Sequence, residues 1–200
     1  MDMMLDEKIA ILEKEKRYEL RNEDNKNSDI SNGIKSSLEK LISDIKLGKV
    51  FVGFNTLEFE KREITKEKLV IPFASDFFEN IEEQENIVSY ENYEEVVSLI
   101  ITLLYEKKKR PQLKAWQKSF KKDMLETQRL YVSITKSCRL KNLDYLCYET
   151  PTSKGRLYNV MFQYVKDDMY YVGVFICENN KKDTIGIMLE AIVNVIDDYN

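Results

Sequence analysis

The last quarter of the chain constrains the fold more than any other stretch. Residues 156–177 read RLYNVMFQYVKDDMYYVGVFIC, a pattern that predicts two long strands joined by a tight turn at 166–168. Both strands carry apolar residues on both faces, so the sheet is expected to be covered on both sides. The stretch 178–200 predicts one closing helix with a core-facing stripe at helical spacing, formed by Ile185, Met188, Leu189, Ile192, Val193 and Ile196.

Two more strands are predicted directly before this pair. RLYVSIT at 129–135 places Leu130, Val132 and Ile134 on one face, and LDYLCYET at 143–150 follows it. Because short turns connect the consecutive strands, they are expected to be antiparallel neighbours. The end of the chain therefore predicts a four-strand meander closed by a helix.

Earlier segments predict further elements of the same domain. Leu57 and Phe59 alternate with glutamates, which is typical of a half-buried strand. LVIPF at 69–73 predicts a short strand at a sheet edge, since proline is rare in central strands. SDFFENI at 75–81 predicts a short helix capped by Ser75 or Asp76.

The run at 96–105, VVSLIITLLY, is compatible with two structures. Glutamates before it and the basic residues after it suit the dipole of a helix. Its Val, Ile and Thr content suits a strand buried on both faces, and we favour the strand.

A clear amphipathic helix is predicted in the middle of the chain. Its apolar stripe is formed by Leu113, Trp116, Phe120 and Met124. Its opposite side is basic and carries Lys114, Lys118, Lys121 and Lys122. A basic run at 107–110 comes just before the helix and extends this charge.

The N-terminal part predicts two helices separated by a polar break at 22–29. The first spans 5–20; the second runs from about Ile30 to Ile45 with a nearly heptad spacing, and Gly48 suits its end. We predict that residues 1–48 form an N-terminal helical arm and that residues 49–200 form one α/β domain. The arm either folds onto the domain, which we favour, or binds a partner as a coiled coil.

The order of these elements predicts an α+β protein with an antiparallel sheet and helices on both faces. KLVIPFASDFFENI, the amphipathic helix, YNVMF and YYVGVFIC with the closing helix resemble bacterial PsbP-like domains over residues 50–199. This resemblance implies an α/β/α sandwich and a non-enzymatic, protein-binding role. Related sequences often have a polar residue where this chain has Ile176 in GVFIC. The resemblance supplies no catalytic residues.

Residue content excludes most common catalytic chemistry. The chain has no histidine, so a Ser–His–Asp triad, a Cys–His pair and histidine-based zinc sites are all absent. Its three cysteines lack CxxC spacing, which is typical of reduced thiols. Cys147 and Cys177 lie in predicted strands as core residues, and Cys138 lies in a basic turn, where an inert surface thiol is favoured over a reactive one. We therefore predict no enzyme, no cofactor and no metal.

The remaining evidence concerns location and partners. The charged N-terminus lacks the apolar core of a signal peptide, so a cytoplasmic protein is expected. The net charge of −4 disfavours nucleic acid and, with the lysine face, favours an acidic protein partner at Lys114, Lys118, Lys121 and Lys122. The alternative interpretation of those lysines is a solvated helix face. The predicted function is an adaptor, chaperone or regulatory protein; the alternatives are an immunity protein for a cognate toxin, or a small-ligand binder or histidine-independent enzyme.

Overall fold

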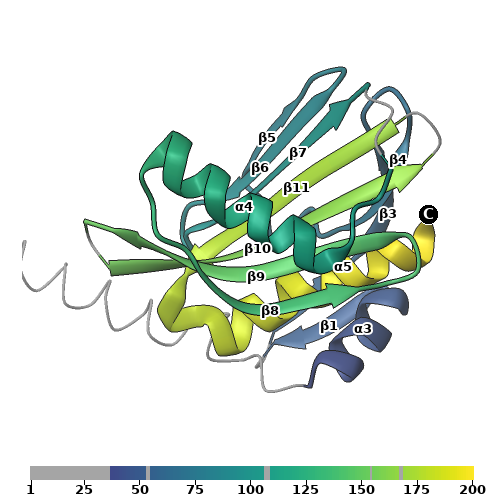
Figure 1. The fold of residues 1–200 in the computed structure, drawn as a ribbon. Helices are drawn as coiled ribbons and strands as arrows, with labels where there is room; N and C mark the ends of the chain where they lie inside the picture. The colour runs from purple at the N-terminus through teal and green to yellow at the C-terminus, as the bar shows by residue number, and fades with distance from the viewer. Residues whose placement is uncertain (1–36, 53–54, 106–108, 154, 167–168) are drawn as a thin grey trace, which may run out of the picture. The chain divides into compact units, whose positions relative to one another are not determined.

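The computed structural model describes residues 37–200 apart from 53–54, 106–108, 154 and 167–168 (Figure 1). The helix predicted at 5–20 and the start of the second predicted helix lie outside these residues. The described part of that second helix, α3 (Leu38–Lys46), begins after Ser37, whose hydroxyl accepts a hydrogen bond from the Lys40 amide. The predicted boundary between residues 48 and 49 remains a prediction.

The described residues contain a seven-stranded antiparallel sheet with the strand order β5-β6-β7-β11-β10-β9-β8. Its strands are β5 (Asn80–Glu83), β6 (Ile87–Asn92), β7 (Val97–Leu104), β8 (Ser133–Arg139), β9 (Leu143–Thr152), β10 (Gly155–Lys166) and β11 (Met169–Glu178). The meander of β8 to β11 is confirmed, with each strand paired to the next. The run at 96–105 is a strand, and it pairs with β11 in the centre of the sheet.

Helices lie on both faces of this sheet, as predicted. α5 (Ile187–Tyr199) follows a 3-10 turn (Asn179–Lys181) and a π-helical turn (Lys182–Gly186) and lies behind the sheet in Figure 1. The predicted stripe of this helix, from Ile185 to Ile196, is buried throughout. α4 (Leu113–Gln128) lies in front of the sheet in the same view.

Two small hairpins complete the described chain, formed by β1 (Lys49–Val52) with β2 (Asn55–Glu58) and by β3 (Glu60–Ile64) with β4 (Leu69–Phe73). The predicted strand at LVIPF is thus confirmed, and Leu57 and Phe59 are both buried. α3 packs on α5 through the buried Leu41 and Ile45. The Asn200 side chain bonds both backbone groups of Val70, which fixes β4 to the end of α5.

The short helix predicted at SDFFENI is wrong. Residues 75–77 form a turn and the chain continues directly into β5. The amides of Phe77 and Phe78 both bond the Ala74 carbonyl, while the Asn92 side chain donates to the Phe77 carbonyl. Both rings are buried: Phe78 packs against Phe73 and Tyr90, and Phe77 packs edge-on against Phe78. Consecutive residues of one helix do not bury both side chains on a single face in this way.

β6 was not predicted from the sequence, although its burial alternates like that of a half-buried strand. Val88, Tyr90 and Asn92 lie on the buried, α5 side of the sheet, and Ser89 and Glu91 face the other way. The polar residues around this short segment hid the alternation.

Candidate protein-interaction surface

α4 is fixed to the sheet by its predicted apolar stripe. Trp116 and Phe120 are buried against Leu146 and Tyr148 of β9, and the ring centroids of Phe120 and Tyr148 are 4.7 Å apart. Leu113 and Met124 pack at the edge of the same cluster. The helix therefore covers the β8–β9–β10 half of this face, because its contacts are with those strands.

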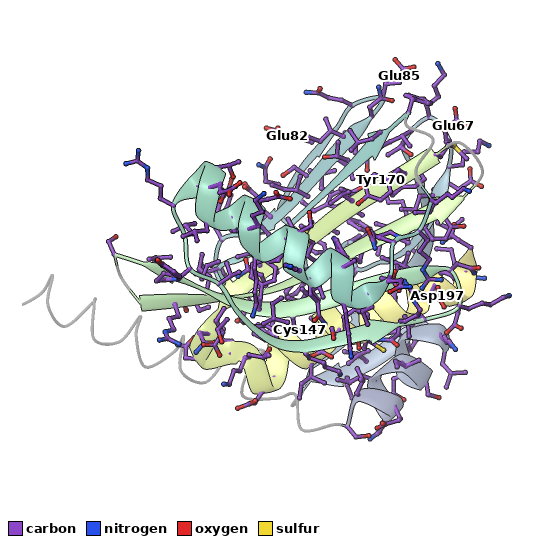
Figure 2. The ribbon with its side chains drawn as sticks, in the orientation of Figure 1. Glu67, Glu82, Glu85, Cys147, Tyr170 and Asp197 are labelled. Carbon is purple, nitrogen blue, oxygen red and sulfur yellow. The ribbon has the colours of Figure 1, made fainter. Side chains whose placement is uncertain are left out.

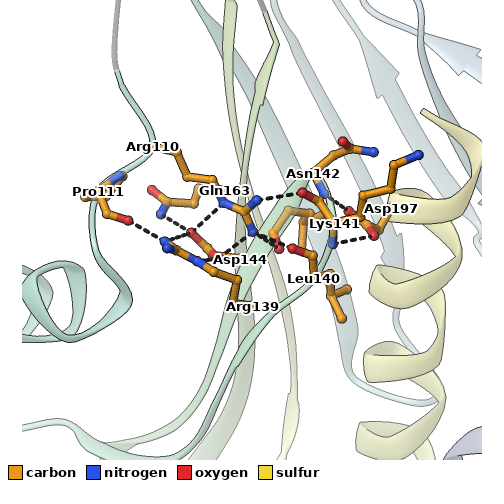
Figure 3. Close-up of polar contacts among 10 residues, drawn as sticks. Arg110, Pro111, Arg139, Leu140, Lys141, Asn142, Asp144, Gln163 and Asp197 are labelled. Carbon is orange, nitrogen blue, oxygen red and sulfur yellow. Dashed lines mark hydrogen bonds and ion pairs between the residues drawn. The ribbon is translucent and has the colours of Figure 1, made fainter.

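A buried ionic cluster fixes the chain just before α4 (Figure 3). Asp144 of β9 is fully buried and accepts paired hydrogen bonds from two guanidinium groups, at 2.7 and 3.0 Å from Arg110 and at 2.8 and 2.9 Å from Arg139. Burial alone would raise the pKa of the Asp144 carboxyl, but the hydrogen bonds from Arg139 and Arg110 outweigh burial and lower this pKa. Arg110 also donates to the carbonyls of Leu140, Lys141 and Leu143, so the β7–α4 connection is tied to the β8–β9 turn.

The same cluster extends onto the sheet surface beside α4. The Gln163 amide donates to Asp144 at 3.2 Å, and the Tyr170 hydroxyl donates to the Gln163 oxygen at 3.0 Å. Gln163 and Tyr170 belong to β10 and β11 and face the same side of the sheet as α4. The ionic cluster thus fixes both α4 and the strand residues next to it.

A groove of about 510 Å³ lies between α4 and these strands. One wall is the side of α4 that presents Ala115, Ser119 and Asp123. The remaining lining is mainly apolar and consists of Lys109, Pro111, Trp116, Phe120, Met161, Gln163 and Tyr170. Such a volume is large enough for several side chains of a partner or for a small ligand.

Beyond the groove, the sheet continues without a covering helix among the described residues. Figure 1 shows the upper parts of β5, β6 and β7 extending beyond α4, and in Figure 2 Glu82 marks the β5 margin and Tyr170 lies along β11. Ile100 pairs with both Ser89 and Val174 across three strands, so these side chains share this side of the sheet. We call this surface the open face; it consists of Ile87, Ser89, Ser98, Ile100, Thr102, Val172, Val174 and Ile176.

The centre of the open face is apolar and accessible. Ile87 and Ile100 are 38% and 37% exposed, and Val172, Val174 and Ile176 are half-buried. These are β-branched residues on central strands, where they would normally be covered by a second layer. The expected coverage of both sheet faces is therefore more extensive on the α5 side than on the α4 side, where α4 covers only β8, β9 and β10.

A second hollow of about 320 Å³ borders the open face at the β6–β7 turn. Its apolar lining includes Tyr93, Val96, Leu157 and Ile176, and both Tyr93 and Val96 are exposed. Val96 has a φ of 53°, an unfavourable conformation for a β-branched residue. The Asn92 side-chain oxygen accepts a hydrogen bond from the Glu95 amide, and this bond holds the turn in its shape.

The basic residues predicted as a partner site lie on the outer side of α4. Lys114, Lys118, Lys121 and Lys122 are all exposed, and Lys122 forms an i,i+4 ion pair with Glu126 at 3.8 Å. Two other members of the basic run, at 107 and 108, lie outside the described residues. Arg110 belongs to the ionic cluster and is not part of an accessible basic face.

The titratable groups under α5 form a second buried cluster that the sequence did not reveal. Glu190 is bonded by Lys136 at 2.5 Å and by the Tyr158 hydroxyl at 2.8 Å. Burial works against the charged form of Lys136, but the hydrogen bond and charge of Glu190 dominate and raise its pKa. Asp197, near the end of α5, is also buried and accepts hydrogen bonds from the backbone amides of Lys141 and Asn142.

The cysteines occupy mostly core positions. Cys147 and Cys177 are buried as predicted, and burial raises the pKa of the Cys177 thiol to about 12. Cys138 lies in β8 paired with Tyr145, so its predicted place in a turn is wrong.

Among the described residues no group of three or more acidic or cysteine side chains is arranged to hold a metal ion. None of the described helices is long and apolar enough to cross a membrane.

Comparison with known proteins identifies solved structures with a similar fold. No family model matches the chain, and no curated protein matches it. The solution structure of cyanobacterial PsbP (CyanoP) from Synechocystis superposes with a TM-score of 0.56 at 7% identity, covering 72% of this chain and 94% of that one. The chain therefore has the PsbP-like fold. The Ran-binding protein Mog1p of Saccharomyces cerevisiae superposes with a TM-score of 0.50 at 13% identity, covering 72% and 98% of the two chains. The resemblance suggested by the sequence is thus confirmed for the fold.

Proposed function

We propose that this protein is a non-enzymatic binding module for another protein and that the open face with the α4 groove is its contact surface. The observation that carries the proposal is the accessible aliphatic centre of the open face, formed by Ile100, Val172, Val174 and Ile176 on two adjacent central strands. Contiguous exposed apolar surface with a polar rim is typical of protein–protein contact sites. The two hollows at its ends offer places for anchoring side chains.

The engagement of the buried acidic residues supports a non-enzymatic role. Asp144, Glu190 and Glu95 each form an ion pair with a lysine or arginine at 2.5–2.8 Å. A general acid or base must face a cleft that substrate can enter. These three carboxylates instead hold α4, α5 and the turn before β7 in place, because each bonds a residue of another element.

The fold comparison gives further support of a general kind. Mog1p, a structure with this fold, is described as a Ran-binding protein and so has a protein partner. We transfer only the class of function, a protein-binding domain, and not the partner. The exposed lysines of α4, Lys114, Lys118, Lys121 and Lys122, favour a partner with acidic residues next to its apolar contact.

The test is affinity capture with three forms of the full-length protein: wild type, Ile100→Glu and Ile81→Glu. Ile81 is the control because it matches Ile100 in residue type and, at 41%, in exposure. It pairs with Tyr90 and therefore lies on the α5 side of the sheet, away from the open face. The three baits are compared in native lysate of the source organism by quantitative mass spectrometry. We expect a protein that wild type and Ile81→Glu retain and Ile100→Glu loses. Equal capture by all three forms, or none by any, contradicts the proposal.

A small-ligand binder is the second candidate, favoured by the groove of about 510 Å³ under Trp116. A metabolite that fills this groove should raise the melting temperature, because a ligand of the folded state stabilises it. A thermal-shift screen with wild type and a groove-filling Ala115→Trp variant separates the two roles. Stabilisation of wild type alone would support a ligand in the groove.

The narrower role of an immunity protein rests on small size and a net charge of −4. It predicts that co-expression rescues cells from a toxin encoded beside this protein. Rescue by wild type and not by Ile100→Glu would assign toxin binding to the open face.

A further inference from the structure

The open face forms the floor of a trough with α4 as one wall. A helix with its side chains is about 10 Å thick, so α4 stands about that far above the strands it covers. α4 packs on β8, β9 and β10, and Figure 1 shows the upper parts of β5, β6, β7 and β11 extending beyond it. A flat surface cannot reach Ile100 or Val174 without meeting α4 first. The trough therefore fits an element about as thick as one helix.

The dimensions of the floor agree with this. Along β11 the residues facing the trough run from Tyr170 to Ile176, which is about 20 Å at the rise of a strand. Across β11, β7 and β6 the floor is about 10–14 Å wide at the usual strand spacing. A helix of about 13 residues, close to four turns, has the length and width to fill this space.

The two sides of the trough carry opposite charge. On the α4 side, Lys109 lines the groove, and Lys118 and Lys122 follow Ala115 and Ser119 by three positions on the helix surface. The acidic residues of this wall are Asp123 and, three positions further on, Glu126, which pairs with Lys122, so the three lysines leave the wall positive overall. On the far side, Glu82 of β5 and Glu91 of β6 face the trough beside Ser89 and Ser98. An occupant that matches both sides is acidic toward α4 and basic toward β5.

We propose that the open face binds an amphipathic α-helix of about four turns contributed by the partner protein. Its apolar stripe packs on Ile100, Val174 and Ile176, its acidic flank lies beside α4, and its basic flank lies beside Glu82 and Glu91. The helix completes the layer that α4 begins. This inference rests on the proposed function and adds the structure and charge pattern of the partner segment.

Two other occupants fit the trough less well. An extended peptide gains its hydrogen bonds at a sheet edge, whereas the backbone of β7 and β11 is already paired on both sides. A second copy would have to pack its own sheet at about 10 Å from this one, and α4 prevents that approach. Both remain distinguishable outcomes in the experiment below.

The experiment uses a fluorescein-labelled, stapled 16-residue helix with a leucine stripe, a glutamate flank and a lysine flank. Three comparison peptides keep its length: one has two glutamate flanks, one has two lysine flanks, and one has serines in place of the leucines. Binding to the full-length protein is measured by anisotropy, and the emission of Trp116, the single tryptophan, reports contact at the groove. We expect the mixed-flank peptide to bind most tightly and the serine peptide at least about 30-fold more weakly.

Protein variants then locate the bound helix. Ile100→Glu should weaken binding of the mixed-flank peptide at least about 30-fold, since it places a charge on the apolar floor, and Ile81→Glu should change it by less than about 2-fold. Lys118→Glu with Lys122→Glu should weaken it about 10-fold at low salt and improve binding of the two-lysine peptide. Lys114→Glu with Lys121→Glu is the matched control on the same helix, since Lys121 lies at the β8 side, and should have a smaller effect.

The outcomes separate this inference from the proposed function. Loss of the cellular partner with Ile100→Glu, combined with equal binding of the leucine and serine peptides, would overturn the helix and leave the protein-binding role intact. A concentration-dependent dimer that Ile100→Glu dissociates would overturn it in favour of a second copy. Tight binding of the mixed-flank peptide that is insensitive to Ile100→Glu would place the helix elsewhere and would also overturn it.

Discussion

Replacement of Asp144 by asparagine tests the ionic cluster that positions α4. Asparagine has nearly the same shape as aspartate but carries no charge. Its NH2 group replaces one of the two acceptor oxygens, so a hydrogen-bond donor would face the donors of the arginine side chains. Asp144 is fully buried, while the side chains of Arg110 and Arg139 are 23% and 43% exposed. The two arginines are therefore partly solvated, which limits the cost of losing their shared carboxylate.

The magnitude follows from what remains after the substitution. Breaking a fully buried ion pair costs about 3–5 kcal/mol of unfolding free energy. Arg110 keeps its three carbonyl acceptors and Arg139 keeps the carbonyl of Pro111, so neither guanidinium is left without partners. We therefore expect Asp144→Asn to lower the unfolding free energy by about 2–3 kcal/mol, less than the fully buried case.

Urea denaturation measures this change with two probes. Trp116 fluorescence reports the α4 contact with β9, and far-UV circular dichroism reports the whole fold. Asp76→Asn, at an exposed aspartate, is the control and should change the unfolding free energy by less than about 0.5 kcal/mol. If Asp144→Asn also stays within about 0.5 kcal/mol of wild type, the cluster contributes no net stability and the reasoning is wrong.

The same substitution has a defined dependence on pH. The pKa of the Asp144 carboxyl is lowered in the folded state from its ordinary 3.8, so the unfolded chain takes up this proton first as pH falls. The stabilisation by Asp144 is therefore complete well above pH 4 and is lost as pH falls through the folded-state pKa. Wild type should approach the stability of Asp144→Asn in acid, and a difference that grows below pH 4 would refute this.

Two further predictions concern the core. Gly173→Ala would push a Cβ into the Phe162 ring and should lower the unfolding free energy by about 1–3 kcal/mol. Combination with Phe162→Leu should recover part of this loss. Urea denaturation measures both variants, and an unchanged unfolding free energy for Gly173→Ala would contradict the close packing. Thiol labelling of the native protein with Ellman's reagent should modify Cys138 and leave Cys147 and Cys177 unmodified, because burial raises the pKa of both buried thiols. All three should react in denaturant, and native labelling of three thiols would refute the assignment.

Long elements with strong periodicity were predictable from the sequence. The stripes at Trp116 and Phe120 and at Met188 to Ile196 identify helices because burial of one side is what stabilises them. The meander was predictable because its strands are long and its turns short. The turn at Phe77 and Phe78 was not, because a local helix-cap signal competes there with an aromatic cluster that only tertiary structure assembles.

Parts of the candidate site were beyond prediction for a similar reason. Arg110 reads as one more residue of a basic run, and its bond to Asp144, 34 residues further along the chain, depends on the β8–β9 turn coming next to the start of α4. The lysine face was identified correctly as an exposed side of a helix. Its relation to an apolar groove was not, because the groove depends on how far α4 extends across the sheet.

The open face exists because the sheet has more apolar surface than the described helices cover. β7 and β11 have apolar residues on both sides, which a sheet needs only if two layers cover it. In the described part of the chain two helices lie on the sheet: α5 packs against one side and α4 covers β8, β9 and β10 on the other. Polar substitution of Ile100, Val174 or Ile176 would have been the simpler way to adapt this face to water. The retention of aliphatic side chains there is explained if a partner supplies the missing part of the layer, and the trough beside α4 has the thickness of a helix.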